Sequence, residues 1–232
     1  MTYDRVTFAV MMASPVDLHD FAIGFSLSEG IIGNPADIAE FELAVLPLGL
    51  ECRMALTPAR REGLEVRRRR IAGPVGCGLC GIDSLTEAVR PPARVEASLR
   101  LPAQEIMSTL ARLPKLQQLN IETRAVHGAG FYTPADGALL VREDVGRHNA
   151  LDKLIGAVRR QGDIGGQGIV LLTSRVSIEL IQKTASLGAS ILVAVSVPSA
   201  RAVRDAQMAG ITLIAVARDD GFEIFTHPER II

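Results

Sequence analysis

The stretch Gly168-Ile169-Val170-Leu171-Leu172-Thr173 decides the fold, because it is a short, uninterrupted run of apolar side chains. A strand with such a run has no polar face, so it must be buried on both sides, as the strands of parallel sheets are. Two further apolar runs, Ser190–Val195 and Ile211–Ala217, follow along the chain. The three runs therefore predict neighbouring strands in the interior of one sheet.

Segments with helical periodicity separate these runs. Helices are expected over Ile178–Leu187 and about Ser199–Ala209, and a glycine suited to end a helix follows each of them. Upstream, Ala138–Val141 is expected to be a strand and Asn149–Arg160 a helix. The alternation predicts an α/β fold with a mainly parallel sheet, right-handed βαβ connections and ligands outside the carboxyl ends of the strands.

The N-terminal third has a different, α+β pattern. Alternating apolar residues predict a strand over Arg5–Met12, and Ser14-Pro15 predicts the start of a helix that ends at Gly30. Phe41–Pro47 and Leu50–Leu56 are expected to pair as a hairpin.

A proline-rich stretch, residues 91–102, predicts a boundary between two parts of the chain. We expect a smaller α+β part over residues 1–95 and an α/β domain over residues 96–232. Just beyond the boundary, Pro102–Leu113 is expected to be a helix that stops before Pro114.

Composition and charge restrict the class of protein. The 232 residues are 48% hydrophobic and 22% charged, which is typical of a globular protein, and the net charge of −1 excludes a generally basic nucleic-acid-binding surface. No apolar run approaches the roughly 20 residues that span a bilayer, and the first residues lack the pattern of a secretion signal. Three cysteines do not suggest a disulfide framework, so we expect no membrane or nucleic-acid partner and a reducing, cytoplasmic compartment.

Two of the cysteines lie in the glycine-rich segment Gly76-Cys77-Gly78-Leu79-Cys80-Gly81. One thiolate of a C-x-x-C pair can attack a sulfur donor while the other is close enough to resolve the product. Ser84–Glu87 has the S-x-x-E form of a helix start, whose positive end favours a thiolate. The alternatives for the pair are a zinc half-site or two buried apolar side chains. The third cysteine, Cys52, is expected to be buried.

Charged side chains crowd the turn Arg142–Asn149, between an expected strand and an expected helix. Such junctions are where α/β proteins place ligand-binding side chains. Arg147 and His148 are the stronger functional candidates. Helix capping by Asp144 or Asn149, together with ion pairing, is the alternative explanation for the rest of the motif.

Three other segments are candidates because of where they lie. His127 is flanked by small residues that leave space near the backbone, although a lone histidine is also common in cores. Ser174-Arg175 follows an apolar strand and precedes a helix, which suits an anionic oxygen, with helix capping by Ser174 or Ser177 as the alternative. Arg218–Gly221 follows the last strand, either as a tight turn or as a lip of the same crevice.

In these motifs the chain resembles the formate dehydrogenase accessory sulfurtransferase family, which sulfurates the bis-molybdopterin guanine dinucleotide cofactor. The blocks that carry the resemblance span almost the whole chain, in order: Met11–Pro15, Gly24–Ile32, Gly76–Gly81, Glu143–His148, Ala150–Lys153, Ser174-Arg175 and Thr226–Pro228. There are two departures. Family members have more residues before the first strand, and they have a Thr-Gly-Gly-like turn where this chain has Thr123-Arg124-Ala125.

The resemblance implies a cytidine-deaminase-like α/β fold, a homodimer and a cysteine desulfurase as sulfur donor. Cys77 would carry the persulfide with Cys80 as its partner, and formate dehydrogenase would be the client. The segment that corresponds to the family's binding site for the molybdenum bis-molybdopterin guanine dinucleotide cofactor comprises Val216, Ala217, Arg218, Asp219, Asp220 and Gly221.

The nucleotide part of this cofactor makes demands that the candidate residues can meet. Its phosphates need cationic partners, and Arg147, Arg175 and Arg218 are the candidates. Asp219 or Asp220 is suited to accept hydrogen bonds from the guanine N1–H and amino group, which adenine does not offer. We therefore expect a guanine nucleotide to bind at the strand ends, with no resident metal.

Two functions from other classes are the rivals. Zinc nucleoside deaminases pair an H-x-E motif with P-C-x-x-C. Here Pro74 lies three residues before Cys77 rather than next to it, which argues against a deaminase. A zinc-stapled, non-enzymatic cofactor chaperone, with Cys77 and Cys80 as ligands, remains the alternative.

Overall fold

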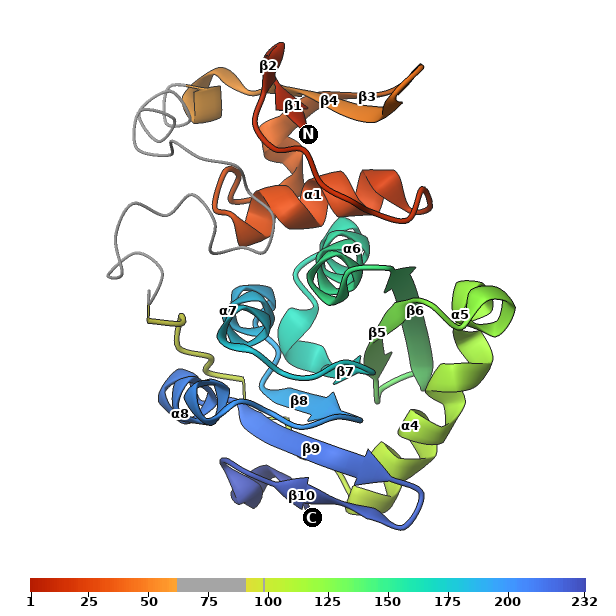
Figure 1. Cartoon of the computed structure of the whole chain (residues 1–232). Coiled ribbons are helices and arrows are strands. Elements are labelled where there is room, and N and C mark those ends of the chain that lie inside the picture. Colours follow the sequence, from red (N-terminus) through yellow and green to blue (C-terminus); the bar gives the residue numbers. More distant parts are fainter. Residues whose placement is uncertain (62–90, 98) are drawn as a thin grey trace.

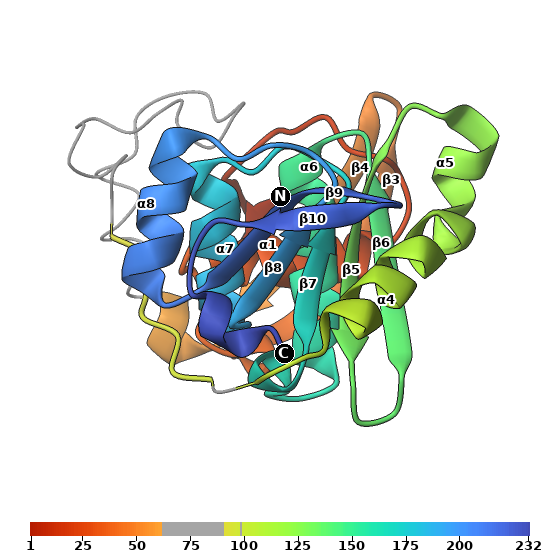
Figure 2. The ribbon, with the colours of Figure 1, turned by 90° about the horizontal axis from the view of Figure 1, so that it is seen from below.

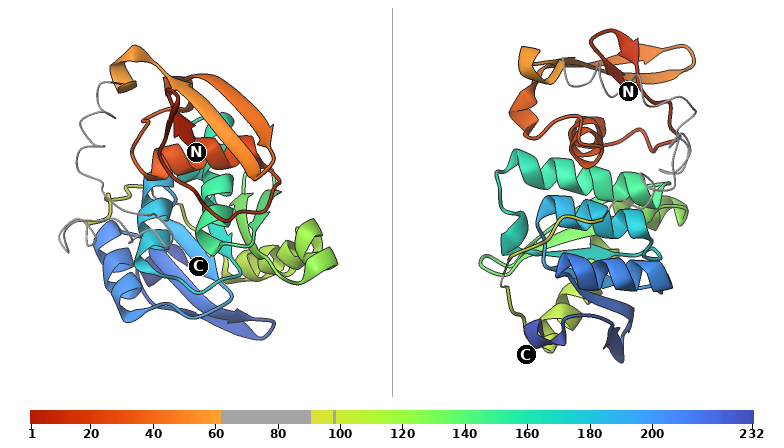
Figure 3. Two further views of the ribbon diagram at one scale, coloured as in Figure 1. Left: turned by 45° about the horizontal axis from the view of Figure 1, so that its top comes forward. Right: turned by 90° about the vertical axis from the view of Figure 1, so that its left-hand side faces the viewer.

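The computed structural model describes residues 1–61, 91–97 and 99–232, in which the chain forms two β-sheets with helices between and around them (Figure 1). A four-stranded sheet from the N-terminal third lies over helix α1 (Leu18–Ser28), and α1 packs on α6 (Arg147–Arg160) (Figure 3). Beyond α6 lies a six-stranded sheet. Helix α4 (Ala103–Leu116) crosses the other face of that sheet (Figure 2).

The six-stranded sheet is mixed, with the strand order β10-β9-β8-β7-β5-β6. Its strands are β5 (His127–Thr133), β6 (Ala138–Asp144), β7 (Ile169–Leu172), β8 (Ile191–Ala194), β9 (Thr212–Arg218) and β10 (Gly221–Ile224). β7–β8 and β8–β9 are parallel, whereas β5–β6, β5–β7 and β9–β10 are antiparallel. The predicted apolar strands are confirmed, but the prediction of a mainly parallel sheet is wrong, because tight hairpins add antiparallel strands on both sides. The cytidine-deaminase-like arrangement stays a prediction.

Burial explains why the parallel strands lack polar side chains. All residues of β7 and β8 are buried, between a face covered by α6, α7 (Ile178–Leu187) and α8 (Ala200–Ala209) and a face covered by α4. Each fully buried leucine or isoleucine contributes roughly 1.5–3 kcal/mol relative to an exposed one. Gly188 and Gly210 end α7 and α8 in the left-handed conformation, at φ 87° and 73°, as the sequence predicts.

The four-stranded sheet has the order β2-β1-β4-β3, with β1 (Thr2–Tyr3), β2 (Val6–Thr7), β3 (Ile38–Leu46) and β4 (Gly49–Leu56). The antiparallel β3–β4 pair confirms the predicted hairpin. Phe21 and Phe25 of α1 pack in one cluster with Met54 and Cys52 of β4, and the burial of Cys52 is confirmed.

Two predictions for the first 20 residues are wrong. The strand expected over Arg5–Met12 comprises only Val6–Thr7. Asp4 and Arg5 both adopt positive φ (47° and 66°) and reverse the chain between β1 and β2, so that this short strand pairs with the two residues of β1. Helix α1 begins at Leu18 with Asp17 as its N-cap, rather than at Ser14. Ser14 cannot cap the helix because its backbone and hydroxyl are bound elsewhere.

The helix expected to stop before Pro114 also departs from prediction. Helix α4 continues through Pro114 to Leu116, and the short α5 (Gln118–Thr123) follows. A proline this close to the helix end removes a single backbone hydrogen bond and is followed by only two more residues, so the helix tolerates it. Among the described helices, none combines the length and apolar character needed to cross a membrane.

The boundary expected near residue 95 stays a prediction. Val95 donates a backbone hydrogen bond of 2.8 Å to the carbonyl of Ala209 at the end of α8, so this segment lies along the six-stranded part of the molecule.

Helices α1 and α6 cross at direct backbone contact. A Cβ on Gly24 would lie 1.7 Å from the carbonyl oxygen of Asp152, and one on Gly156 would lie 1.9 Å from that of Asp20. Only glycine permits this approach. The crossing therefore fixes the N-terminal layer against the six-stranded part.

Candidate functional site

One edge of the six-stranded sheet gathers the segments that the sequence singles out. The ends of β6, β7, β8 and β9 lie there, and β5 begins there because it runs antiparallel to β6 and β7. The segment after β8 stays paired with its neighbours on both sides: the N–H of Val176 donates to Val197 O at 3.1 Å, and the N–H of Val216 in β9 donates to Ser196 O at 3.2 Å. We refer to this region as the strand-end edge.

Arg147 and Arg175 form a cation cluster around His127 on the strand-end edge. Burial lowers the pKa of His127, and the neighbouring guanidinium groups of Arg147 and Arg175 lower it further. The Nε of Arg147 is buried and has no hydrogen-bond partner among the described residues. A guanidinium with an unused N–H beside a second guanidinium is suited to bind phosphate or carboxylate oxygens.

His148 lies in the first turn of α6, next to the cation cluster. Its Nε2 is 3.3 Å from Ser177 Oγ and 3.8 Å from Glu179 Oε2. Burial, followed by the positive charges of Arg147 and Lys183, lowers its pKa to about 4. His148 is therefore neutral at pH 7. Ser177 occupies the N-cap position of α7, but its side chain contacts His148 instead of accepting a helix N–H.

The predicted cofactor loop is the end of β9 and a hairpin turn. Val216, Ala217 and Arg218 belong to β9, Asp219 and Asp220 are exposed in the turn, and Gly221 (φ 150°) starts β10. The guanidinium of Arg218 donates to the carbonyls of Val195 and Ala217, which ties the end of β9 to the segment after β8. The structure thus brings this turn, Ser174-Arg175 and the cation cluster onto one edge; their binding role stays a prediction.

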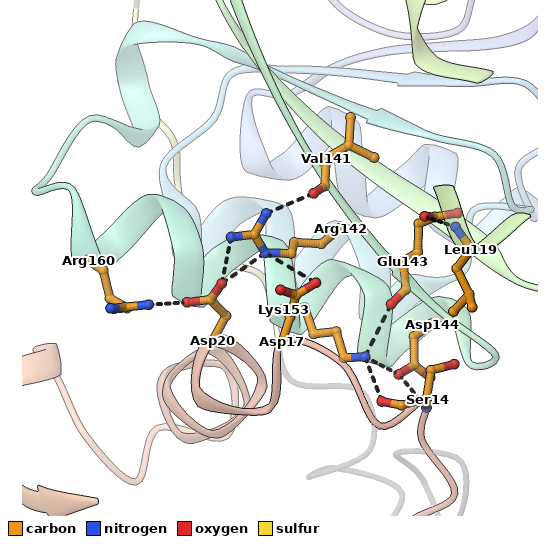
Figure 4. A network of polar contacts seen from close by, with 10 residues as sticks. All are labelled: Ser14, Asp17, Asp20, Leu119, Val141, Arg142, Glu143, Asp144, Lys153 and Arg160. Atoms are coloured by element: carbon orange, nitrogen blue, oxygen red, sulfur yellow. Dashed lines mark hydrogen bonds and ion pairs between the residues drawn. The ribbon is translucent and has the colours of Figure 1, made fainter. Parts of the chain in front are cut away.

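Glu143 and Asp144, the acids of the same motif, have structural partners (Figure 4). The Glu143 carboxylate accepts the N–H groups of Leu119 (2.8 Å) and Asn120 (2.9 Å) at the start of α5. Asp144 is fully buried in an ion pair with Lys153. Of the alternative explanation for these residues, helix capping by Asp144 or Asn149 is wrong, because Gly146 holds the N-cap position of α6, whereas ion pairing is confirmed for Asp144.

The local sequence around Lys153 does not reveal the role of this residue. Its signal is position: Lys153 lies three residues after Ala150 and one before Leu154, within the apolar stripe that α6 turns inward. A lysine in such a stripe requires a buried carboxylate, and Asp144 is the acid nearest in sequence on the preceding strand.

Cys77 and Cys80 lie outside the described residues, as does the helix start expected at Ser84–Glu87. In the part of the chain that the structure describes, no three His, Cys, Asp or Glu side chains are grouped as metal ligands.

His227-Pro228-Glu229 has the H-x-E spacing found in zinc nucleoside deaminases. The Nδ1 of His227 lies 3.3 Å from Glu229 Oε1, and its Nε2 lies 3.0 Å from the carbonyl oxygen of Gln207. His227 lies beside the start of β9, not on the strand-end edge.

A groove of about 1050 Å³ runs along the four-stranded sheet, away from the strand-end edge. Its lining carries both acids, such as Glu42 and Glu51, and bases, such as Arg53. It contains none of the predicted binding residues. We therefore place the candidate site on the strand-end edge, where the chemistry is concentrated.

Comparison with known proteins agrees with this arrangement of motifs. The FdhD/NarQ family model matches residues 1–232. The chain is 52% identical to the sulfur carrier protein FdhD of Agrobacterium fabrum over 232 residues (100% of this chain, 86% of the relative). It is 49% identical to that of Brucella abortus over 233 residues (100% and 87%).

A crystal structure from Desulfotalea psychrophila, described as a formate dehydrogenase accessory protein, superposes with a TM-score of 0.73 at 26% identity and covers 100% of this chain and 86% of its own. The match of the family model over the whole chain, the identity to the curated relatives and this shared architecture agree. The chain therefore belongs to the FdhD/NarQ family.

Proposed function

We propose that the protein carries sulfur from a cysteine desulfurase to the molybdenum bis-molybdopterin guanine dinucleotide cofactor, on which formate dehydrogenase activity depends. The observation that carries this proposal is the similarity of the whole chain to proteins named sulfur carrier protein FdhD, at up to 52% identity. The chain's own Cys77 and Cys80 supply the sulfur chemistry. The family resemblance adds a homodimer to the proposal, and the cysteine content adds a reducing, cytoplasmic compartment.

Cys77 is the proposed sulfur acceptor. Its thiolate attacks the terminal sulfur of the desulfurase persulfide, so that a new S–S bond forms on Cys77 and the desulfurase leaves as a thiolate. This exchange needs no external oxidant or reductant. Cys80 either takes over the terminal sulfur by the same exchange, which regenerates the Cys77 thiolate, or attacks Cys77 and releases the sulfur as sulfide, which leaves a Cys77–Cys80 disulfide for a cellular thiol to reduce. When the terminal sulfur passes to the molybdenum of the substrate cofactor, the loaded cysteine keeps the electron pair of the S–S bond and returns to the thiolate, and a reduced molybdenum of that substrate would supply the two electrons that convert the sulfur into a sulfido ligand.

The strand-end edge is the proposed binding surface for the cofactor. The cation cluster would bind phosphate oxygens, since the Nε of Arg147 is buried and unused by the described residues. Asp219 or Asp220, both exposed at the β9–β10 turn, would accept hydrogen bonds from guanine. His148, neutral at pH 7, would accept or donate a proton next to the phosphates.

The sulfur step is tested by intact mass spectrometry after incubation with a cysteine desulfurase and cysteine. The wild-type protein is expected to gain sulfur that a reductant removes, and Cys77→Ala is expected to gain none at that position and to leave formate dehydrogenase inactive in cells. Cys52→Ala, which changes a buried cysteine, is the matched control and should load normally. Full client activity with Cys77→Ala would refute the proposal.

The binding step is tested by calorimetry with guanosine and adenosine diphosphates. Arg218→Ala and Asp219→Ala are each expected to weaken guanosine diphosphate binding without preventing sulfur loading. Equal affinity for the two nucleotides would contradict guanine recognition, and unchanged affinity in both variants would contradict the assignment of the turn.

Metal analysis separates the proposal from the zinc-stapled chaperone. The purified protein is expected to contain well under one zinc per chain, because zinc would occupy the thiolates that sulfur transfer requires. Stoichiometric zinc that is lost in a Cys77→Ala, Cys80→Ala double variant would favour the chaperone instead.

A further inference from the structure

The fully buried ion pair between Asp144 and Lys153 is the polar centre of the molecule (Figure 4). Both side chains are 0% exposed, and their charged atoms are 2.7 Å apart. The ammonium of Lys153 also donates to the carbonyls of Ser14 (3.0 Å) and Glu143 (3.1 Å). Lysine has three N–H donors, so all of them are used here.

Asp144 collects three further hydrogen bonds, and they come from two other segments. Its Oδ2 accepts the N–H of Ser14 (2.9 Å), and its Oδ1 accepts the N–H of Gly146 (2.8 Å) and the Nδ2 of Asn149 (3.0 Å). The hydroxyl of Ser14 accepts the N–H of Val145 at 3.0 Å. Asn149 Nδ2 also donates to the carbonyl of Met12 at 2.9 Å.

These contacts fix the backbone on both sides of the first turn of α6, where the candidate site begins. The turn carries Arg147 and His148. Asp144 binds it from the end of β6, and the segment Met12–Ser14 binds Asp144 and Asn149 from the N-terminal layer. Met12 and Val145, whose backbone groups take part in these contacts, have exposed side chains (85% and 46%).

Stability alone does not explain the pair. Two well-packed apolar side chains of similar volume stabilise a core about as well as a buried ion pair, because both charges lose their water. What apolar residues would not provide is direction: the pair satisfies two carbonyls and several N–H groups at defined angles. Its distinctive contribution is therefore the position of the backbone that it binds.

We propose that Asp144 and Lys153 are positioning residues that hold the first turn of α6 and the segment Met12–Ser14 in place, so that Arg147 faces the anionic part of the ligand in the orientation required for binding. This inference rests on the proposed function, because it assigns the turn to nucleotide binding. It extends the site to a lysine that contacts no ligand and to residues of the N-terminal layer.

The test measures guanosine diphosphate affinity by calorimetry and thermal unfolding side by side. Lys153→Met, of similar length without the charge, is expected to bind up to about tenfold more weakly. Asn149→Ala, which removes only the contacts of one half-buried amide, is expected to bind several-fold more weakly and keeps the test available if Lys153→Met does not fold. Leu113→Ala, in the core on the far face of the sheet, is the control: it should lower the unfolding temperature and leave affinity unchanged.

The outcomes distinguish this inference from the proposal on which it rests. If the wild-type protein binds the nucleotide and the folded variants bind it equally well, the positioning role is wrong and the proposed function stands. Loss of affinity in Leu113→Ala as large as in Lys153→Met would also overturn the positioning role, because destabilisation alone would then explain both. If the wild-type protein does not bind the nucleotide, nucleotide binding at this edge and the positioning role fall together.

Discussion

Helix α6 differs along its length, and the comparison of its two regions separates what holds this protein together from what equips it for function. In its middle, Gly156 lies against the backbone of α1, with no space for even a methyl group. In its first turn, Arg147 and His148 lie at an edge where charges are crowded and one buried guanidinium N–H has no partner among the described residues. Packing determines the residue in the middle, whereas the first turn carries charges that packing does not require.

The largest effect on stability is expected from a substitution in the middle of α6, where it packs on α1. Gly156→Ala would place a Cβ 1.9 Å from the carbonyl oxygen of Asp20. Alanine favours a helix by about 1 kcal/mol over glycine, but forcing the two helices apart costs about 3 kcal/mol or more. We therefore expect a net loss of stability, measured by denaturant unfolding.

The control for this substitution is another glycine with space around it. Gly166→Ala would place its Cβ 3.4 Å from the nearest atom, an ordinary contact, so stability should change by less than about 0.5 kcal/mol. Equal stability of Gly156→Ala and the wild type would show that the α1–α6 crossing is not as tight as described.

The first turn of α6 should make the stability of the protein depend on pH, through His148. His148 has a folded-state pKa of about 4, below the ordinary value of 6.5, because of burial and the nearby cations. Between these values the unfolded chain binds a proton that the folded chain does not, so stability falls as the pH drops from about 6.5 to 4. His148→Gln should reduce this loss by about 1–3 kcal/mol. Unfolding curves at pH 7, 5.5 and 4 would measure the difference, and parallel losses in both proteins would contradict it.

The sequence predicts the regular parts of the fold, and its failures have physical causes. The apolar runs of β7, β8 and β9 and the glycines after α7 and α8 are local signals, and all are confirmed. The mixed parallel and antiparallel pairing of the sheet is not visible in the apolar pattern of the strands. It depends on the turn between β5 and β6, whose Pro134-Ala135-Asp136-Gly137 sequence is a hairpin signal that the periodicity of the neighbouring strands does not contain.

The candidate site is predicted in the same uneven way. Ligand-binding residues of an α/β fold gather at strand ends, so His127, Arg147 and Ser174-Arg175 are brought to one edge as expected. The partners of Ser14 are not foreseeable from its own neighbourhood, because they come from a strand and a helix more than a hundred residues away. Local helix-start signals at Ser14-Pro15 are overridden by these tertiary contacts.

A smaller effect is expected from reducing the charge at the strand-end edge. Arg147→Met should weaken guanosine diphosphate binding about tenfold, equivalent to about 1.4 kcal/mol. It should also raise the pKa of His127 toward its ordinary value, since Arg147 is one of the two cations that lower it. Calorimetry measures the affinity, and NMR titration of the imidazole measures the pKa; a pKa of His127 that does not move would contradict the cluster.

The smallest effect is expected in the N-terminal layer. Cys52→Ala removes the thiol of a residue that is 5% exposed, packs in the apolar cluster of α1 and β4 and donates one weak hydrogen bond, at 3.9 Å, to the carbonyl of Leu18. Stability should fall by about 1 kcal/mol, while nucleotide affinity and sulfur loading stay unchanged. Thermal unfolding together with sulfur loading checks both parts, and a loss of loading would give Cys52 a chemical role that its burial does not suggest.

The buried contacts of Ser14 also constrain the order of events during synthesis. Its partners Asp144 and Lys153 lie 130 and 139 residues further along the chain. Synthesis adds residues one after another, at roughly 5–20 per second. The N-terminal layer, β1–β4 with α1, therefore leaves the ribosome before α6 and cannot dock until α6 has emerged. Its apolar face stays exposed during that interval. Contacts of such long sequence separation also make folding slow, so the segment that completes the site is made well before its partners and reaches its final place only after they have been made.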